Sequence, residues 1–299
     1  MARERERLGC AAESLGRQEL LLGTASRVRR WLLVEQPGSW GRDAIRESHL
    51  PAEVADQLHR AARAHRVRVL LVRRSVRPSS PPDARSAFLV RSDPTSPWTE
   101  RVALTDPDTL LRLDLGAMAA EERPGVGEPA GPLHLVCTNG RHDPCCADLG
   151  RPVVRALRED GVDVWESSHV GGDRFAANVV CLPTGVYFGR VPPEAAPQIV
   201  RDHDAGLLAL EHYRGRSCHP PLVQAAEVFA RVELDERRLA ELGPRSWATD
   251  GDRATVELGL GGGVVTVEVS RRHGPSVALT CGPDSSAPWR YRLDVIRQP

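Results

Sequence analysis

Two short clusters of metal-ligand residues constrain this chain more than any other feature of its sequence. The first cluster is Cys137, Cys145 and Cys146, and the second is His169 and Asp173. One predicted helix and one predicted strand separate them, so we expect each cluster on a loop of its own. Thiolate, imidazole and carboxylate groups are the protein ligands of iron and zinc. A fold that joins the two loops would therefore place four donors around one or two of these ions.

The distribution of cysteines favours a metal or redox role over a disulfide framework. The seven cysteines are spread unevenly over 299 residues, and three of them fall within ten residues. The N-terminus lacks the apolar core of a secretory signal, so we expect a cytoplasmic protein. In a reducing compartment, clustered thiols more often hold metal or do redox work than form disulfides.

Composition argues against several other classes of protein. Hydrophobic residues make up 41% of the chain and charged residues 27%, which is typical of a globular protein. No apolar run approaches the roughly 20 residues that cross a bilayer, so no membrane partner is expected. The 40 basic and 40 acidic residues balance, which gives no case for nucleic-acid binding. All the basic residues are arginine, which together with the Ala, Gly and Pro content suggests a high-GC bacterial gene.

The first half of the chain is predicted to follow the order strand, helix, strand, strand. The helix, from about Pro51 to His65, has apolar residues at helical spacing. The strands are expected at residues 31–35, 67–74 and 87–91. This order is compatible with a thioredoxin-like domain, whose redox cysteines would follow the first strand. The loop at residues 36–40 contains no cysteine, so we predict a scaffold half without dithiol chemistry.

A second unit of similar order follows, and then a strand-rich tail. Residues 116–131, which are small, acidic and broken by Pro and Gly, mark the predicted boundary. The unit is expected to have strands at 134–137, 162–166, 179–183 and 186–191, and helices at 151–159, 173–180 and 193–210. The tail is expected to have helices at 222–231 and 235–242, then half-buried antiparallel strands. We therefore predict an α/β (α+β) fold with regions at 1–130, 131–220 and 221–299.

Three segments carry a resemblance to a known family. They are VCTNGRHDPCCADLG at residues 136–150, SSHVGGDRFAANVV at 167–180 and GVYFGRV at 185–191. The sequence resembles the sucrase/ferredoxin-like family over roughly residues 10 to 215. The resemblance implies two thioredoxin-like halves in tandem, of which the second is a thioredoxin-like ferredoxin with a [2Fe-2S] cluster.

The resemblance also implies a set of cluster ligands. The family pattern is similar to Cys…Arg-Asp-x-x-Cys followed by His-Val-Gly-Gly-His, which carries over to Cys137, Cys146 and His169. Cys145 is the neighbouring alternative to Cys146. Asp173 stands where the family pattern has its second histidine, and a carboxylate there would favour the oxidised state and lower the potential. In the other interpretation, Asp173 only caps a helix that begins at the next residue.

Further residues around the two clusters are predicted to support the site. Gly171 and Gly172 have no side chains, so the backbone can pass close to an inorganic group there. Arg141 either hydrogen-bonds cluster sulfides and attracts an acidic partner, or is simply a solvated charge. Asn178 is expected to pin the second loop through backbone hydrogen bonds.

These observations and the resemblance favour a one-electron carrier rather than a stand-alone enzyme. No flavin- or nicotinamide-binding fingerprint is present in the sequence, so a separate reductase would donate the electron and a separate protein would accept it. Two alternatives remain open. One is a thiol redox enzyme that uses Cys145 and Cys146, and the other is a zinc-stabilised interaction module, because zinc binds the same ligand types.

Overall fold

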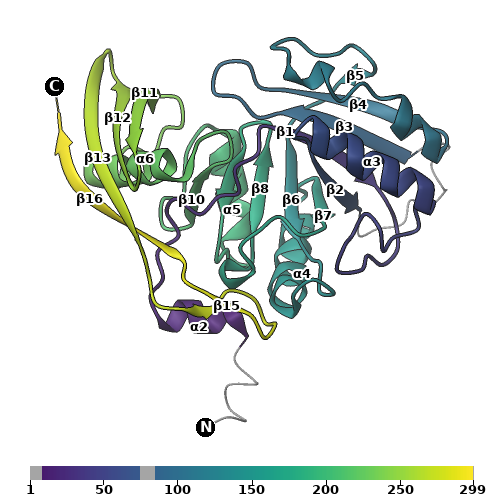
Figure 1. The fold of residues 1–299 in the computed structure, drawn as a ribbon, viewed down its shortest axis with the longest axis horizontal. Helices are drawn as coiled ribbons and strands as arrows, with labels where there is room; N and C mark the ends of the chain where they lie inside the picture. Colours follow the sequence, from purple (N-terminus) through teal and green to yellow (C-terminus); the bar gives the residue numbers. More distant parts are fainter. Residues whose placement is uncertain (1–8, 75–84, 299) are drawn as a thin grey trace, which may run out of the picture.

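The computed structural model describes residues 9–74 and 85–298. Its main feature is a ten-stranded sheet in the order β10-β9-β8-β6-β7-β2-β1-β3-β4-β5, with helices packed on it (Figure 1). A smaller antiparallel sheet from the C-terminal part of the chain lies at one end of the molecule, and helix α3 lies at the opposite end. Both helices and strands are present throughout, which confirms the predicted α+β class.

The first half of the main sheet has the predicted order and two further strands. Its elements are β1 (Arg30–Glu35), α3 (Ala52–Ala64), β2 (Arg68–Arg73), β3 (Arg85–Arg91) and β4 (Trp98–Leu104). Strand β1 pairs in parallel with β2 and antiparallel with β3. Helix α3 forms because Val54, Leu58 and Ala62 recur on one face, and this face is buried against the sheet. Strand β4 and the short β5 (Glu128–Pro129) complete this side.

The second half repeats the same topology. Its elements are β6 (Leu133–Cys137), α4 (Pro144–Glu159), β7 (Val164–Ser167), β8 (Val179–Leu182), β9 (Val186–Phe188) and α5 (Ala196–Asp204). Strand β6 pairs in parallel with β7 and antiparallel with β8. Each half therefore places its first strand between its second and third strands, with a helix connecting the parallel pair. This is the thioredoxin-like arrangement, present twice in tandem.

The two halves share one sheet through β2 and β7. These strands pair antiparallel over Val72 with Ser167 and Arg73 with Glu166. An ion pair of 2.9 Å between Arg73 and Glu166 reinforces the contact. One face of the sheet also buries a core common to both halves, in which Trp31 and Leu33 belong to the same cluster as strand residues of the second half. The halves therefore share hydrophobic packing as well as hydrogen bonds.

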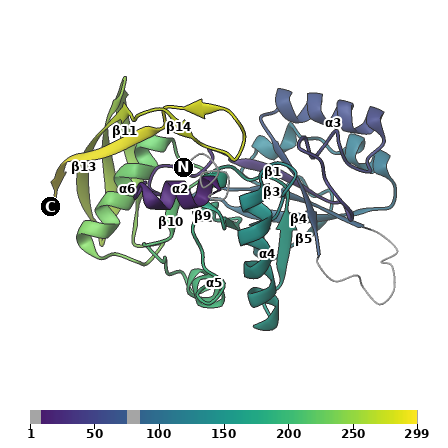
Figure 2. The same cartoon turned by 90° about the horizontal axis from the view of Figure 1, so that it is seen from below.

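The C-terminal part is a small sheet packed on a helix, as the alternating sequence predicts. Its elements are α6 (Pro221–Leu234), β11 (Leu242–Asp250), β12 (Arg253–Leu260), β13 (Gly263–His273), β14 (Val277–Ala278), β15 (Ser285–Ser286) and β16 (Trp289–Arg297). The strand before them, β10 (Tyr213–Arg216), pairs with β9 at the edge of the main sheet. Strands β11, β12, β13 and β16 form an antiparallel sheet whose alternate apolar residues pack against α6. Between β13 and β16, the chain runs as an arm to α2 (Cys10–Gly16), near the N-terminus (Figures 1 and 2).

The structure corrects several predicted boundaries. Helix α4 begins at Pro144 and not at Arg151, because Asp143 caps it through a hydrogen bond from the backbone N–H of Cys145, at 2.9 Å. The helix predicted at 235–242 is absent from the described residues, since Asp235 ends α6 in the left-handed region (φ 47°). The helix predicted at 173–180 is only the 3₁₀ turn η3 (Asp173–Phe175), and α5 is shorter than expected.

The remaining short elements are the 3₁₀ turns η1 (Pro107–Arg112) and η2 (Ala117–Ala119), which lie near the predicted boundary between the halves. The domain limits inferred from the sequence stay a prediction. None of the helices in residues 9–74 and 85–298 has the length and apolar character needed to cross a membrane.

Candidate metal centre

The predicted metal ligands gather at one edge of the main sheet. Cys137 is the last residue of β6, and Cys146 lies in the first turn of α4, which follows it. His169 and Asp173 follow β7. Because β6 and β7 are parallel, their carboxyl ends meet at the same edge, and the two ligand segments become neighbours. The late start predicted for α4 was wrong, so Cys145 and Cys146 lie in a helix rather than on a loop.

The four principal donors are linked by short distances. The Sγ of Cys146 donates a hydrogen bond of 3.1 Å to Oδ1 of Asp173, and Nδ1 of His169 lies 2.8 Å from the same oxygen. The donor atoms of Cys137, Cys146 and His169 all lie within 4.8 Å of one another, as do those of His142, His169 and Asp173. The fold therefore joins the two clusters that the sequence separates by more than twenty residues.

His142 is an additional member of this group that the predicted ligand set does not include. Its ring stacks on that of His169 with 3.7 Å between the ring centroids and an interplanar angle of 19°. Its Nε2 lies 3.7 Å from Oδ2 of Asp173. Because His142 lies only three residues before Cys145 in the sequence, its closeness to the cysteine cluster could have identified it as a candidate ligand.

Burial separates the donors into an inner and an outer group. Cys137 and Cys146 are each 1% exposed and Asp173 is 3% exposed, whereas the side chain of His169 is 23% exposed. The inner donors are shielded from water, and His169 is the donor that faces the surface. Solvent and any partner molecule would reach the centre on the His169 side.

The close donors shift one another's pKa values. Pairing with Cys146 holds the pKa of Cys137 well below the usual thiol value, while the same pairing and burial raise the pKa of Cys146. Burial lowers the pKa of His169, but the contacts with Asp173 and Cys137 outweigh it and raise the pKa to about 9. Burial raises the pKa of Asp173, and the contact with His169 more than reverses this. The centre thus stabilises anions next to an imidazolium.

Asp173 does not act as a helix cap. The residue before the 3₁₀ turn is Gly172, and no side chain caps that turn. The carboxylate of Asp173 instead contacts His169, His142 and Cys146. The capping interpretation of Asp173 is therefore wrong, and the carboxylate lies among the metal-ligand candidates.

The other predicted site residues lie in different surroundings. Gly171 and Gly172 have φ values of 101° and 83°, and a Cβ on Gly172 would lie 2.4 Å from Nη2 of Arg214. Backbone conformation and close packing therefore require both glycines, and a role beside a cofactor stays a prediction. Arg141 is exposed, and its role also stays a prediction. The Sγ of Cys145 belongs to a separate group with Cys10 and Cys281.

Arg214 supports the second ligand segment from outside the predicted site. It is 1% exposed, and it donates hydrogen bonds to the carbonyl of Gly171 (3.0 Å) and to Oδ1 of Asn178 (2.6 Å). Asn178 in turn donates a hydrogen bond of 2.9 Å to the carbonyl of Gly172, as expected from the sequence. Arg214 lies on β10, a strand that sequence patterns did not predict, so no local signal identifies it.

Fold and site together define a tandem thioredoxin-like α+β protein with a candidate metal centre in its second half. The chain matches the sucrase/ferredoxin-like family over residues 21–215, about two thirds of its length, and it belongs to that family.

One curated relative is the Altered inheritance of mitochondria protein 32 of the yeast Debaryomyces hansenii. It is 34% identical over 95 residues, which are 28% of this chain and 35% of the relative. The chain thus spans about a third of that protein's length. Because the relative is a yeast protein, it gives no support to the bacterial origin that the composition suggests.

Solved structures similar to this chain include the thioredoxin-like [2Fe-2S] ferredoxin from Aquifex aeolicus and a cysteine-to-serine variant of it. Both are 21% identical to this chain. The match to the variant covers 29% of this chain and 100% of the variant, and the match to the parent covers 30% and 94%. The TM-scores are 0.26, so the thioredoxin-like topology rests on the strand order described above.

Proposed function

We propose that this protein is a one-electron carrier that holds a [2Fe-2S] cluster in its second half. The proposed ligands are Cys137, Cys146, His169 and Asp173. The observation that carries the proposal is the convergence of two buried thiols, an imidazole and a carboxylate at the carboxyl ends of β6 and β7. Membership of the sucrase/ferredoxin-like family supports the same choice of cofactor.

The chemistry of the donors fits such a cluster. Thiolates are the usual ligands of iron–sulfur clusters, and imidazole replaces some of them in clusters of higher potential. Nδ1 of His169 is buried and makes no hydrogen bond of good geometry within the described residues, although Asp173 lies close to it. This nitrogen would bind a metal once the imidazolium has lost its proton. A proton on either Cys137 or Cys146 would leave on metal binding, because a thiol must be deprotonated to ligate.

Each residue has a distinct part in the proposed function. When bound, the cluster supplies a site that takes up and releases one electron. The two thiolates and Asp173 surround it with negative charge, which favours the oxidised state and a low potential. His169 is the exposed donor, so we propose that electrons enter and leave on its side. The donor is proposed to be a separate reductase and the acceptor a separate protein, both met in the cytoplasm.

A structural zinc ion on the same donors is the second candidate. The donor atoms of Cys137, Cys146 and His169 lie within 4.8 Å of one another, and Oδ1 of Asp173 lies 3.1 Å from the Sγ of Cys146, which also suits a single tetrahedral ion. A thiol redox pair of Cys145 and Cys146 has less support, because the Sγ of Cys145 faces Cys281 while that of Cys146 faces Asp173.

The test is metal analysis of the full chain purified without oxygen. We expect about two irons and two sulfides per chain, visible absorption that bleaches on reduction, and a spin-half electron paramagnetic resonance signal after dithionite. Cys137→Ser and Cys146→Ser should lose the iron, and Asp173→Ala should retain less of it. Cys145→Ser should keep it, and Cys218→Ser, a buried cysteine outside the donor groups, is the matched control.

Two results would overturn parts of this proposal. Iron that is kept in Cys146→Ser and lost in Cys145→Ser would show that the ligand choice is wrong. A colourless protein that holds zinc at these donors, even after anaerobic reconstitution with iron and sulfide, would replace the electron carrier by the structural zinc site.

A further inference from the structure

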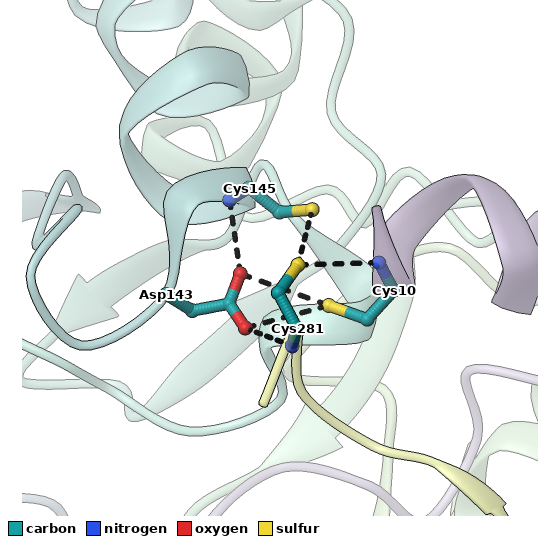
Figure 3. Close-up of side chains that lie close together, drawn as sticks. All are labelled: Cys10, Asp143, Cys145 and Cys281. Carbon is teal, nitrogen blue, oxygen red and sulfur yellow. Dashed lines mark hydrogen bonds between the residues drawn. The ribbon is translucent and has the colours of Figure 1, made fainter. Parts of the chain in front are cut away.

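A second group of metal-ligand side chains lies outside the proposed cluster site. It comprises Cys10 at the start of α2, Asp143 and Cys145 at the start of α4, and Cys281 on the arm between β14 and β15 (Figure 3). Cys10 and Cys281 are 271 residues apart in the sequence. The four donor atoms nevertheless all lie within 4.8 Å of one another. Three remote segments of the chain thus deliver three thiols and a carboxylate to one point.

The distances match the size of a single tetrahedral ion. With Zn–S bonds of about 2.3 Å, two sulfur ligands of one zinc ion lie about 3.8 Å apart. The Sγ atoms of Cys145 and Cys281 are 3.4 Å apart, and the Sγ of Cys10 lies 3.6 and 3.7 Å from the two carboxylate oxygens of Asp143. Small movements of the side chains would bring all four donors to bonding distance of one ion.

The backbone around the group holds the donors in place. The carboxylate of Asp143 accepts hydrogen bonds from the backbone N–H of Cys145, at 2.9 Å, and from that of Cys281, at 2.6 Å. The N–H of Cys10 donates to the Sγ of Cys281, at 3.3 Å. Figure 3 shows the four side chains pointing toward a common centre. Hydrogen bonds to a metal-binding carboxylate and thiolate are the usual support of a metal site.

Gly9, the residue before Cys10, leaves room for the thiols of this group. A Cβ on Gly9 would lie 2.5 Å from the Sγ of Cys145 and 3.4 Å from that of Cys281. Any side chain at this position would therefore displace the thiols. The absence of a side chain lets the backbone at Gly9 lie directly against the thiols of Cys145 and Cys281.

We propose that Cys10, Asp143, Cys145 and Cys281 bind one structural zinc ion. Three thiolates and one carboxylate complete a tetrahedral, closed coordination sphere, which is the form of structural rather than catalytic zinc sites. Thiolates select zinc over the hard ions magnesium and calcium. Four donors that surround one point suit a single ion.

The zinc ion would link α2 and the arm between β14 and β15 to the first turn of α4. Cys145 precedes Cys146, a proposed cluster ligand, in the first turn of α4. Zinc at this point would tie the N-terminal helix and the C-terminal arm to that turn. The site is separate from the proposed electron-transfer centre, because the two groups share no residue.

The test is the zinc and iron content of the full chain and of cysteine variants, measured by mass spectrometry of the metals after anaerobic purification and titration with Zn²⁺ alone. We expect about one zinc per chain in the wild type and none in Cys10→Ser or Cys281→Ser, with iron unchanged. Cys137→Ser should show the converse, iron lost and zinc kept. Cys218→Ser, a buried cysteine outside both groups, is the matched control and should keep both metals.

A second measurement on the wild type covers the case in which a variant fails to fold. Zinc should protect Cys10, Cys145 and Cys281 from alkylation, and a chelator should expose them, as mapped by peptide mass spectrometry. Wild-type zinc levels in both Cys10→Ser and Cys281→Ser would overturn the proposal. So would a wild type that takes up no Zn²⁺, or a mapped Cys145–Cys281 disulfide in protein kept away from oxidants. Absence of iron from the wild type would instead count against the electron carrier alone.

Discussion

Replacing Arg214 by methionine tests how the second ligand segment is held in place. The guanidinium of Arg214 is buried and donates hydrogen bonds to the carbonyls of Gly171 and Thr24, to Oγ1 of Thr24 and to Oδ1 of Asn178. Burial lowers its pKa to about 10, so the side chain keeps its charge at neutral pH. Methionine is an unbranched side chain of similar volume without a hydrogen-bond donor. The substitution therefore removes the hydrogen bonds without opening a large cavity.

The expected loss of stability follows from the acceptors that are left behind. The carbonyls of Gly171 and Thr24 and Oδ1 of Asn178 lose a charged donor, and each buried unsatisfied acceptor costs about 1–3 kcal/mol. Even at the low end, the free energy of unfolding falls by about 3 kcal/mol. With an unfolding entropy of about 2.1 cal/mol/K per residue over 299 residues, the midpoint of thermal unfolding falls by roughly 5 °C.

The assay is thermal unfolding followed by circular dichroism, with the bound iron measured on the same samples. Arg216→Met is the matched control, because Arg216 lies on the same strand but donates one hydrogen bond, of 3.2 Å, to the carbonyl of Thr184. Its midpoint should fall by only about 2 °C. The Arg214 variant should also retain less iron, since Gly171 and Asn178 lie in the segment around Asp173. A midpoint no lower than that of the Arg216 variant would refute the reasoning.

Two further predictions concern buried charges elsewhere in the chain. Arg231→Met should lower the free energy of unfolding by about 3–5 kcal/mol in urea titrations, because it strands the fully buried carboxylate of Glu227, which is 2.9 Å from it. Adding Glu227→Gln should recover part of the loss, and a double variant as unstable as the single one would contradict this. Burial lowers the pKa of His203 from its usual 6.5 to about 4, so stability should be level above pH 6.5 and fall by up to about 3 kcal/mol as the pH drops toward 4. The unfolded chain takes up that proton first; His203→Gln should flatten this slope, and an unchanged slope would count against it.

Most regular elements of the two halves could be predicted because their apolar periodicity is local. Helix α3 is an example, with its buried residues on one face. The start of α4 was predicted too late, at residue 151, and Gly150 and Pro152, residue types that disfavour helix interiors, lie inside the helix. In the structure, a Cβ on Gly150 would lie 2.2 Å from the carbonyl oxygen of Cys137, so this glycine allows the helix to pack closely on β6. A packing requirement of this kind has no signature in the local sequence.

Of the two candidate metal sites, one could be predicted from local sequence motifs and the other could not. The donors of the proposed cluster fall into two compact motifs, and the parallel pairing of β6 and β7 joins them, so sequence reasoning could find them. Nothing near Cys10 or Cys281 in the sequence indicates a metal ligand. Their contact depends on a long arm that returns to the N-terminal helix, and only the tertiary structure reveals it.

The pairing of β2 with β7 has a consequence for colloidal behaviour. In the second half alone, β7 would be an outer strand, and its backbone groups at Glu166 and Ser167 would lie open to any passing strand. Unpaired edges of this kind are templates for aggregation. Strand β2 of the first half covers this edge of β7. The first half therefore prevents the second half from aggregating through that edge.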